Sequence, residues 1–182
     1  LFTDIDELSN FPDYQNLIEK YNNSLWSRRR PESDLMIEHN EVFINDYKLD
    51  TCKIIEKLQE LAESGIENYS NDVEFWLLFD DYEIDCDEKK DIITRIFSES
   101  KVGVIYGSAG VGKSTLINHV SHYLNDANKL YLTQTNPAKE NLMRKIDAEN
   151  TTFSTIESFK HQNFSLAEYK LLVIDECSTV SN

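Results

Sequence analysis

A glycine-rich segment in the middle of the chain constrains the fold more than any other part of the sequence. It fits the phosphate-binding pattern G-x-x-x-x-G-K-[ST], and an apolar run, residues 102–106, leads into it. Glycines let the backbone turn so that successive N–H groups point at phosphate oxygens, and the N-terminus of a following helix adds a favourable dipole. The segment therefore predicts a phosphate-binding loop between a buried strand and a helix. Its residues are Gly107, Ser108, Ala109, Gly110, Val111, Gly112, Lys113, Ser114 and Thr115.

Two side chains of this loop have predicted roles in binding a nucleoside triphosphate. Lys113 is expected to reach the β- and γ-phosphates, and the hydroxyl of Ser114 is expected to hold Mg²⁺. The alternative is a glycine-rich turn that binds nothing. Because the flanking segments have the patterns of a strand and a helix, the phosphate-binding interpretation is favoured, and ATP and Mg²⁺ are the expected ligands.

The region after residue 100 alternates between strand and helix patterns. Short apolar runs predict buried strands, and apolar residues at helical spacing predict the helices between them. Such alternation is typical of an α/β fold with a parallel sheet that helices cover on both faces, and a nucleotide then binds at the carboxyl ends of the strands. Strands are predicted at 102–106, 129–133 and 171–174, a strand and turn at 151–159, and helices at 114–125 and from Pro137.

Two adjacent carboxylates follow the last of these strands. Asp175 and Glu176 come directly after the apolar run 171–174. In a P-loop protein, Asp175 would bind Mg²⁺ through its water shell, and Glu176 would orient and deprotonate the attacking water. Alone, such a pair could be an ordinary loop start. In a chain with a phosphate-binding loop, the pair favours ATP hydrolysis over phosphate transfer to a substrate hydroxyl.

The charge of the chain is unevenly distributed. The formal charge is −15, and residues 1–100 hold 25 acidic and 10 basic residues, whereas residues 101–182 hold eight of each. The acidic half is a poor surface for nucleic acid, because attraction to phosphate needs Lys and Arg. A solvated acidic face is the plainer interpretation, and a basic protein partner is the alternative. We expect an acidic, mainly helical region at 1–85 and a P-loop domain at 86–182.

A further part of the acidic half has a pattern of its own. Residues 73–82 are apolar nearly all round a predicted helix, which predicts that this helix is buried.

Cys52, Cys86 and Cys177 form no C-x-x-C pair, which argues against a zinc site or a disulfide framework and fits a reducing cytoplasm. No apolar run approaches about 18 residues, so no membrane segment is expected. The chain opens with Leu1 rather than Met, and we expect it to be part of a longer protein.

Four segments of the region 86–182 together resemble the first motor domain of superfamily 1 helicases, most closely the RecD-like branch. The phosphate-binding loop resembles motif I of that family, and residues 173–178 resemble motif II. Residues 132–139 resemble motif Ia, and residues 153–159 resemble the following Thr-Ile-His segment. In the family both of these contact the backbone of single-stranded DNA. The resemblance implies a RecA-like fold and an ATP-driven motor on single-stranded DNA, with RNA left open.

The resemblance assigns nucleic-acid contacts to Thr133, Thr135, Asn136 and Thr155. Considered from the residues alone, the first three are short hydrogen-bonding side chains at the end of a strand. They suit contact with a phosphate backbone without reading bases. The alternative is that they cap the helix that starts at Pro137. The sequence leaves both interpretations open.

The chain also departs from the family pattern. The segment 85–93 has Lys89 and Lys90 but no Gln, where the family has a Gln that reads adenine, so adenine specificity is not implied. Glu157 stands where the family commonly has His, and Cys177 stands where a small Ala is usual. The family's second motor domain, with its arginine finger, lies outside this sequence. We therefore expect slow hydrolysis by this chain alone.

Two other functions fit the sequence. The protein could be a nucleotide-gated regulator whose acidic half engages a protein partner, or an AAA-type ATPase that works without nucleic acid.

His119 and His122 lie three residues apart on the helix after the loop. A metal site there would need further ligands, so packing or surface roles are favoured for both histidines.

Overall fold

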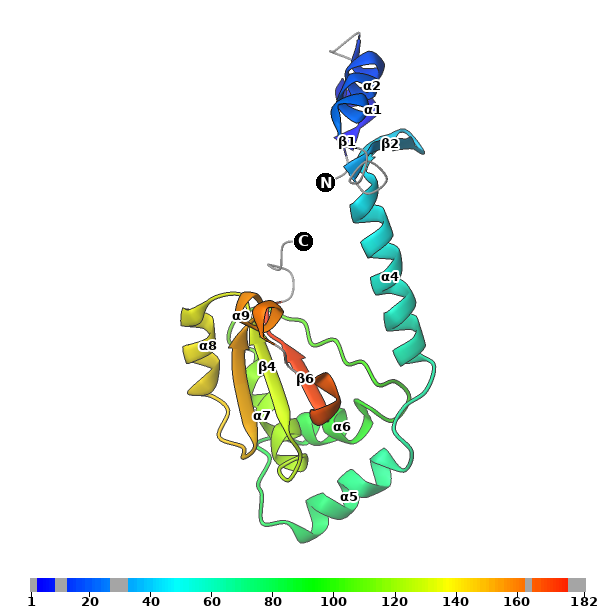
Figure 1. Cartoon of the computed structure of the whole chain (residues 1–182). Helices are drawn as coiled ribbons and strands as arrows, with labels where there is room; N and C mark the ends of the chain where they lie inside the picture. Colours follow the sequence, from blue (N-terminus) through cyan, green and yellow to red (C-terminus); the bar gives the residue numbers. More distant parts are fainter. Residues whose placement is uncertain (1–2, 9–12, 27–32, 163–164, 177–182) are drawn as a thin grey trace. The chain divides into compact units, whose positions relative to one another are not determined.

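The structure is a computed structural model of the chain, and it describes residues 3–8, 13–26, 33–162 and 165–176 (Figure 1). Cys177 and the end of the motif II-like segment lie outside these residues. The chain forms two compact units, which divide between residues 60 and 61. The functional boundary expected between residues 85 and 86 stays a prediction. Within the described ranges, no helix is long and apolar enough to cross a bilayer.

The first unit contains a small antiparallel sheet as well as helices. Its strands are ordered β1-β3-β2, and Val42 and Phe43 of the central strand are buried. His39 and Asn40 form the two-residue turn between β2 and β3, both with positive φ, as tight hairpin turns require. The elements are β1 (Thr3–Asp4), α1 (Ile5–Leu8), α2 (Tyr14–Ser24), β2 (Leu35–Glu38), β3 (Glu41–Ile44) and most of α4 (Asn45–Ala62).

The second unit is built on a three-stranded parallel sheet with the order β5-β4-β6. The central strand, β4, is buried along its whole length. Parallel pairing brings the carboxyl ends of all three strands to one edge of the sheet. The strands are β4 (Lys129–Thr133), β5 (Thr151–Thr155) and β6 (Leu171–Ile174). The helices are α5 (Tyr69–Phe79), α6 (Asp87–Arg95), α7 (Lys113–Tyr123), α8 (Asn136–Met143), α9 (Ile156–His161) and the 3₁₀ turn η1 (Leu166–Glu168).

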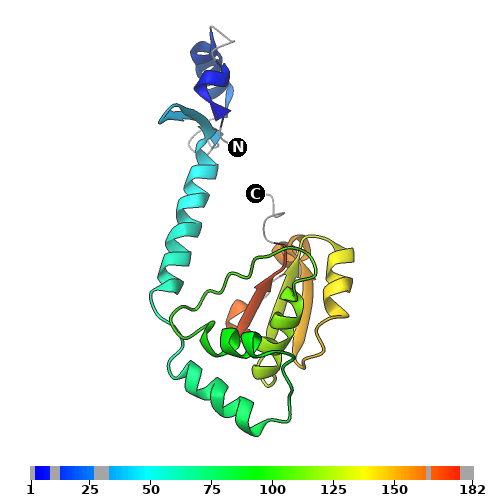
Figure 2. The ribbon, with the colours of Figure 1, turned by 180° about the vertical axis from the view of Figure 1, so that it is seen from behind.

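The two faces of this sheet are covered to different extents. Tyr131 lies in register with Phe153 and Val173, and side chains from α7 and α8 pack against these three residues. Figure 2 shows α7 across this face, whereas Figure 1 looks onto the opposite face. On that face, Leu172 and Ile174 of β6 stay exposed. The expected α/β fold is present, but the expected helical cover is incomplete on one side.

The apolar run 102–106, predicted to be a buried strand, is not a strand in the structure. Val104 is 77% exposed and Tyr106 is 90% exposed. Figures 1 and 2 both show the run as an extended trace along the free side of β6. Parallel strands occur where other elements cover both faces of the sheet. Leu172 and Ile174 of the adjacent strand β6 are exposed, so a further strand at this edge would also have one uncovered face.

Helix α5 corrects a second prediction. The sequence predicts a helix over 73–82 that is buried all round, but α5 begins at Tyr69, and one of its sides is exposed. Tyr69 and Val73 are buried in a core cluster with Leu116 and Val120 of α7. An apolar helix is buried only on the sides that have a packing partner, and the second unit offers α5 one such side.

Lys129, the first residue of β4, is a fully buried lysine at the end of α7. Its Nζ donates hydrogen bonds to the carbonyl oxygens of Leu124 (2.7 Å), Asn125 (3.2 Å) and Ala127 (2.8 Å). These carbonyls belong to the C-cap residue of α7 and to the turn that follows it, where the negative end of the helix dipole favours a cation. Burial lowers the pKa of Lys129.

Replacing Lys129 by Met is expected to lower the free energy of unfolding by about 2 kcal/mol, because three carbonyls lose a charged donor. Denaturant titration followed by circular dichroism measures this change. Lys145→Met is the matched control, since Lys145 is exposed, and it should leave the stability unchanged. Equal stability of both variants would show that water replaces the ammonium at no cost.

Candidate functional site

The glycine-rich segment forms the turn before α7, and α7 begins at Lys113. Gly110 and Gly112 have φ values of 85° and 89°, in the left-handed region that favours glycine. Gly112 is the N-cap residue of α7, and no side chain caps this helix end. The N–H groups of the first turn and the positive end of the helix dipole are therefore available to an anion.

Lys113 folds back over this loop. Its Nζ donates hydrogen bonds to the carbonyl oxygens of Gly107 (2.8 Å) and Ser108 (2.9 Å). In a nucleotide complex, phosphate oxygens would accept hydrogen bonds from this ammonium in place of the two carbonyl oxygens. Ser114 is partly buried beside Lys113, and Thr115 is exposed on the next position of the helix. The loop thus has the donors and the conformation that a phosphate ligand needs.

The two predicted carboxylates directly follow β6. The N–H of Asp175 donates to the carbonyl oxygen of Leu132 at 2.9 Å, which extends the contact between β6 and β4 by one residue. The sheet therefore fixes the position of Asp175, which is partly buried, while Glu176 is exposed with a φ of 52°. Among the described contacts, no hydrogen bond or ion pair joins Asp175 to Lys113 or Ser114.

The four predicted nucleic-acid residues lie at the carboxyl ends of β4 and β5. Thr133 and Thr155 are register partners and are buried, and the Thr133 hydroxyl donates to the carbonyl oxygen of Thr135 at 3.1 Å. The Thr135 hydroxyl accepts a hydrogen bond from the third residue of α8 (3.3 Å), and the Thr155 hydroxyl accepts one from the third residue of α9 (3.1 Å). Both threonines are therefore N-caps, while Asn136 is exposed at the start of α8.

A chain of polar contacts that the sequence does not reveal connects the core with the loop. The Tyr82 hydroxyl lies 2.9 Å from Nδ1 of His119, and Nε2 of His119 lies 3.0 Å from Oδ1 of Asp85. Asp85 also forms an ion pair with Lys89. The end of the Lys89 side chain lies 3.4 Å from the position that a Cβ on Gly112 would occupy. Lys89, from the segment where the resembled family has its Gln, therefore lies against the phosphate-binding loop.

These contacts explain the pKa shifts around the loop. Hydrogen bonds from Lys89 and His119 lower the pKa of Asp85. Burial, together with the negative charges of Asp147 and Asp85, raises the pKa of Tyr82 to about 12. His122 stacks on Tyr82, and its Nε2 lies 2.7 Å from Oδ1 of Asp147. Both histidines thus have packing and hydrogen-bonding roles.

Alkaline pH is expected to destabilise the second unit. The pKa of Tyr82 rises from 10.0 to about 12 on folding, and burial also raises the pKa of Tyr69. The unfolded chain therefore loses these protons first, and stability that is complete below pH 10 declines as the pH rises towards 12. Denaturant titrations across this pH range measure the decline.

Tyr69→Phe is the informative variant for this prediction. The Tyr69 hydroxyl is buried without a hydrogen-bond partner among the described residues, so its removal should raise the free energy of unfolding by about 1 kcal/mol at neutral pH. The variant should also reduce the alkaline loss of stability. An unchanged pH dependence in Tyr69→Phe and Tyr82→Phe would contradict the assignment to these two side chains.

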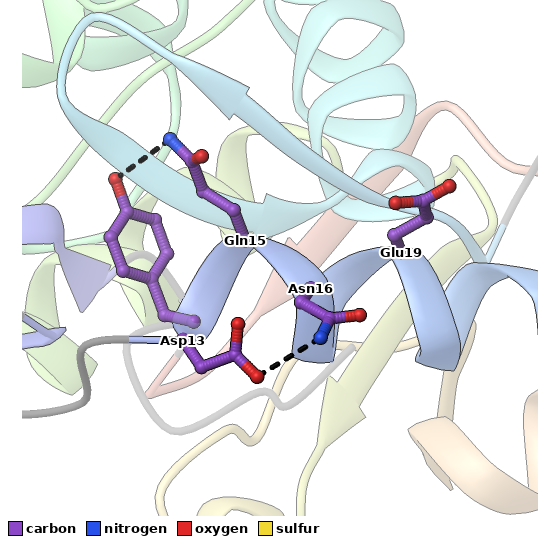
Figure 3. Close-up of a pocket in the computed structure, with 5 residues that line it drawn as sticks. Asp13, Gln15, Asn16 and Glu19 are labelled. Atoms are coloured by element: carbon purple, nitrogen blue, oxygen red, sulfur yellow. Dashed lines mark hydrogen bonds between the residues drawn. The ribbon is translucent and has the colours of Figure 1, made fainter.

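A separate shallow pocket lies at the start of α2 in the first unit (Figure 3). The Asn16 amide donates to the Asp13 carboxylate at 3.0 Å, and the Gln15 amide lies 3.4 Å from the Tyr14 hydroxyl. These polar groups bond mainly to one another on the surface of one helix. The pocket contains none of the predicted site residues, and we assign it no role. Its lining residues are Asp13, Tyr14, Gln15, Asn16 and Glu19.

A parallel sheet, a glycine-rich loop that opens a helix, and carboxylates at the carboxyl end of β6, a strand predicted to be buried but exposed at Leu172 and Ile174, define a nucleotide-binding P-loop NTPase domain. Comparison with protein families supports this class. The family described as "AAA domain" matches residues 89–182, which is more than half of the chain. The chain therefore belongs to the AAA domain family. No curated protein matches the chain.

Proposed function

We propose that this chain is the ATP-hydrolysing part of a superfamily 1 helicase or translocase, most similar to the RecD-like branch. The observation that carries the proposal is the loop at residues 107–112, with Lys113 folded over it, together with the carboxylates after β6. The segments after β4 and β5 extend the proposal from ATP hydrolysis to movement on single-stranded nucleic acid.

The residues of the loop fit Mg²⁺·ATP. The uncapped start of α7 and the Lys113 ammonium would bind the phosphates, and the Ser114 hydroxyl and Asp175 would hold the ion. When bound, Mg²⁺ would neutralise the negative charge that develops on the phosphate oxygens. Glu176 would accept a proton from the attacking water, and its exposed position leaves it open to solvent.

Single-stranded DNA is the proposed partner, and RNA is not distinguished from it. Asn136 and Thr135 are exposed beside the carboxyl end of β4, where a phosphate backbone could contact them. A cytoplasmic location is part of the proposal. It is supported by the free cysteines Cys52 and Cys86 and by the cysteine spacing.

The test is ATP hydrolysis with and without an unstructured single-stranded DNA oligonucleotide. We expect Mg²⁺-dependent hydrolysis that the oligonucleotide stimulates, and Asn136→Ala should reduce the stimulation but not the basal rate. Asn118→Ala, on α7, is unsuitable as a control because its amide donates to Asp147. Gln162→Ala is the better control, because the Gln162 side chain is exposed just after α9. This variant should keep the stimulation of the parent chain.

A different result would favour the second candidate, a nucleotide-gated regulatory or AAA-type ATPase. The acidic helical region with its exposed apolar side chains on α5 supports that candidate. Hydrolysis that single-stranded DNA and RNA both leave unchanged would contradict the motor and retain the ATPase. Failure to bind ATP at all would contradict both candidates.

A further inference from the structure

Helix α5 is apolar on two sides, and only one of them is packed. Tyr69 and Val73 are buried, and Trp76 and Leu77 pack against the same core cluster. In Figures 1 and 2, α5 lies at the outer end of the second unit, with the other elements of that unit to one side of it. Three large apolar side chains remain uncovered, and we call them the α5 patch. They are Phe75 (62% exposed), Leu78 (78%) and Phe79 (71%).

The α5 patch is a continuous surface rather than a set of scattered residues. Its members occupy positions i, i+3 and i+4, which lie on one side of a helix. The rings of Phe75 and Phe79 are 4.3 Å apart between centroids, so they form one aromatic surface. Single exposed apolar residues are ordinary, but a contiguous group bordered by polar residues is typical of a protein interaction site.

The surroundings of the α5 patch are strongly acidic. From residue 58 to residue 88 the sequence contains eleven Asp and Glu residues and no Lys, Arg or His. Asp72, Glu74, Asp80 and Asp81 lie on or directly after α5 and are exposed, and no ion pair neutralises these four within the described part of the chain. Nucleic acids and anionic membranes are repelled by such a surface, whereas a cationic partner is attracted to it.

We propose that the α5 patch is a docking site for a basic amphipathic helix of a partner protein. The apolar side of the partner would cover Phe75, Leu78 and Phe79, and its Lys and Arg residues would face Asp72, Glu74 and Asp80. Charge complementarity selects this partner over a second copy of the chain, because two acidic surfaces repel each other. The proposal does not depend on the helicase function, since α5 carries no residue of the phosphate-binding loop.

The test uses a synthetic amphipathic helix of leucine and lysine, with the leucines at helical spacing, and measures its affinity by fluorescence anisotropy. Phe75→Ala and Phe79→Ala should each weaken binding about tenfold, as expected for central aromatic residues of an interface. Ile54→Ala is the matched control, because Ile54 is an exposed apolar residue on α4. The affinity of this variant for the peptide should equal that of the parent chain. Asp80→Asn combined with Asp81→Asn should weaken binding and reduce its salt dependence.

Three results would overturn the proposal. The first is equal affinity of the parent chain and both Phe variants. The second is equal binding of a peptide with serine in place of every leucine, which would mean charge attraction alone. The third is a dimer, seen by sedimentation, that Phe79→Ala disrupts, which would make a second copy the occupant. Circular dichroism shows that the variants are folded without any use of ATP, so failure here is separate from failure of the proposed ATPase.

Discussion

Replacing Lys113 by Ala is expected to weaken ATP binding by roughly 100-fold or more. The Lys113 ammonium makes two hydrogen bonds inside the loop, to Gly107 and Ser108, and phosphate oxygens would replace those acceptors. Hydrogen bonds from a charged donor contribute about 1.5–3 kcal/mol each, and two of them account for an effect of this size. Equilibrium titration with a fluorescent ATP analogue measures the affinity.

Lys145→Ala is the control for this change, because it removes an exposed lysine of the same unit outside the loop. Circular dichroism should show that both variants are folded. If Lys113→Ala bound ATP as tightly as the parent, the loop at 107–115 would not be the nucleotide site.

Replacing Glu176 by Gln is expected to slow ATP hydrolysis by about 10²–10⁴-fold while ATP binding stays near the parent value. The amide keeps the size of the carboxylate but cannot accept the proton of the attacking water, and general-base catalysis contributes an effect of this order. Single-turnover hydrolysis measures the chemical step, and the ATP analogue titration measures binding.

The matched control for this second change is Glu168→Gln, at an exposed carboxylate in η1. It should hydrolyse ATP at the parent rate. A Glu176→Gln chain that hydrolysed ATP as fast as this control would exclude Glu176 as the base. Loss of binding in Glu176→Gln would instead place the carboxylate in nucleotide or Mg²⁺ binding.

Local patterns in the sequence predicted the central part of the second unit. β4 and β6 have the predicted bounds, and α7 begins within one residue of its predicted start. Apolar runs and helical spacing are properties of neighbouring residues, so they can be read without knowing what packs against them. An N-cap role for Thr135 could also be predicted from the sequence, because capping depends only on neighbouring residues.

Predictions that depended on distant partners were less successful. The run 102–106 has the pattern of a buried strand, but a parallel strand is buried only where other elements cover both faces of the sheet. Likewise, no local pattern shows that Lys89 of α6 lies against Gly112, because the contact joins two elements far apart in the sequence. The two carboxylates after β6 were predicted as a pair with the loop, and the geometry of that pair stays a prediction.

The environment of Lys129 makes this residue a reporter of local opening. Amine-modifying reagents react with lysines that solvent can reach, so they should label Lys145 quickly and spare Lys129 in the folded chain. Lys129 becomes reactive only when its ammonium leaves the carbonyl oxygens at the end of α7. Its labelling rate, followed by mass spectrometry, therefore measures how often the corner between α7 and β4 opens. A slower rate in the presence of ATP would show that the loop at one end of α7 stabilises the other end.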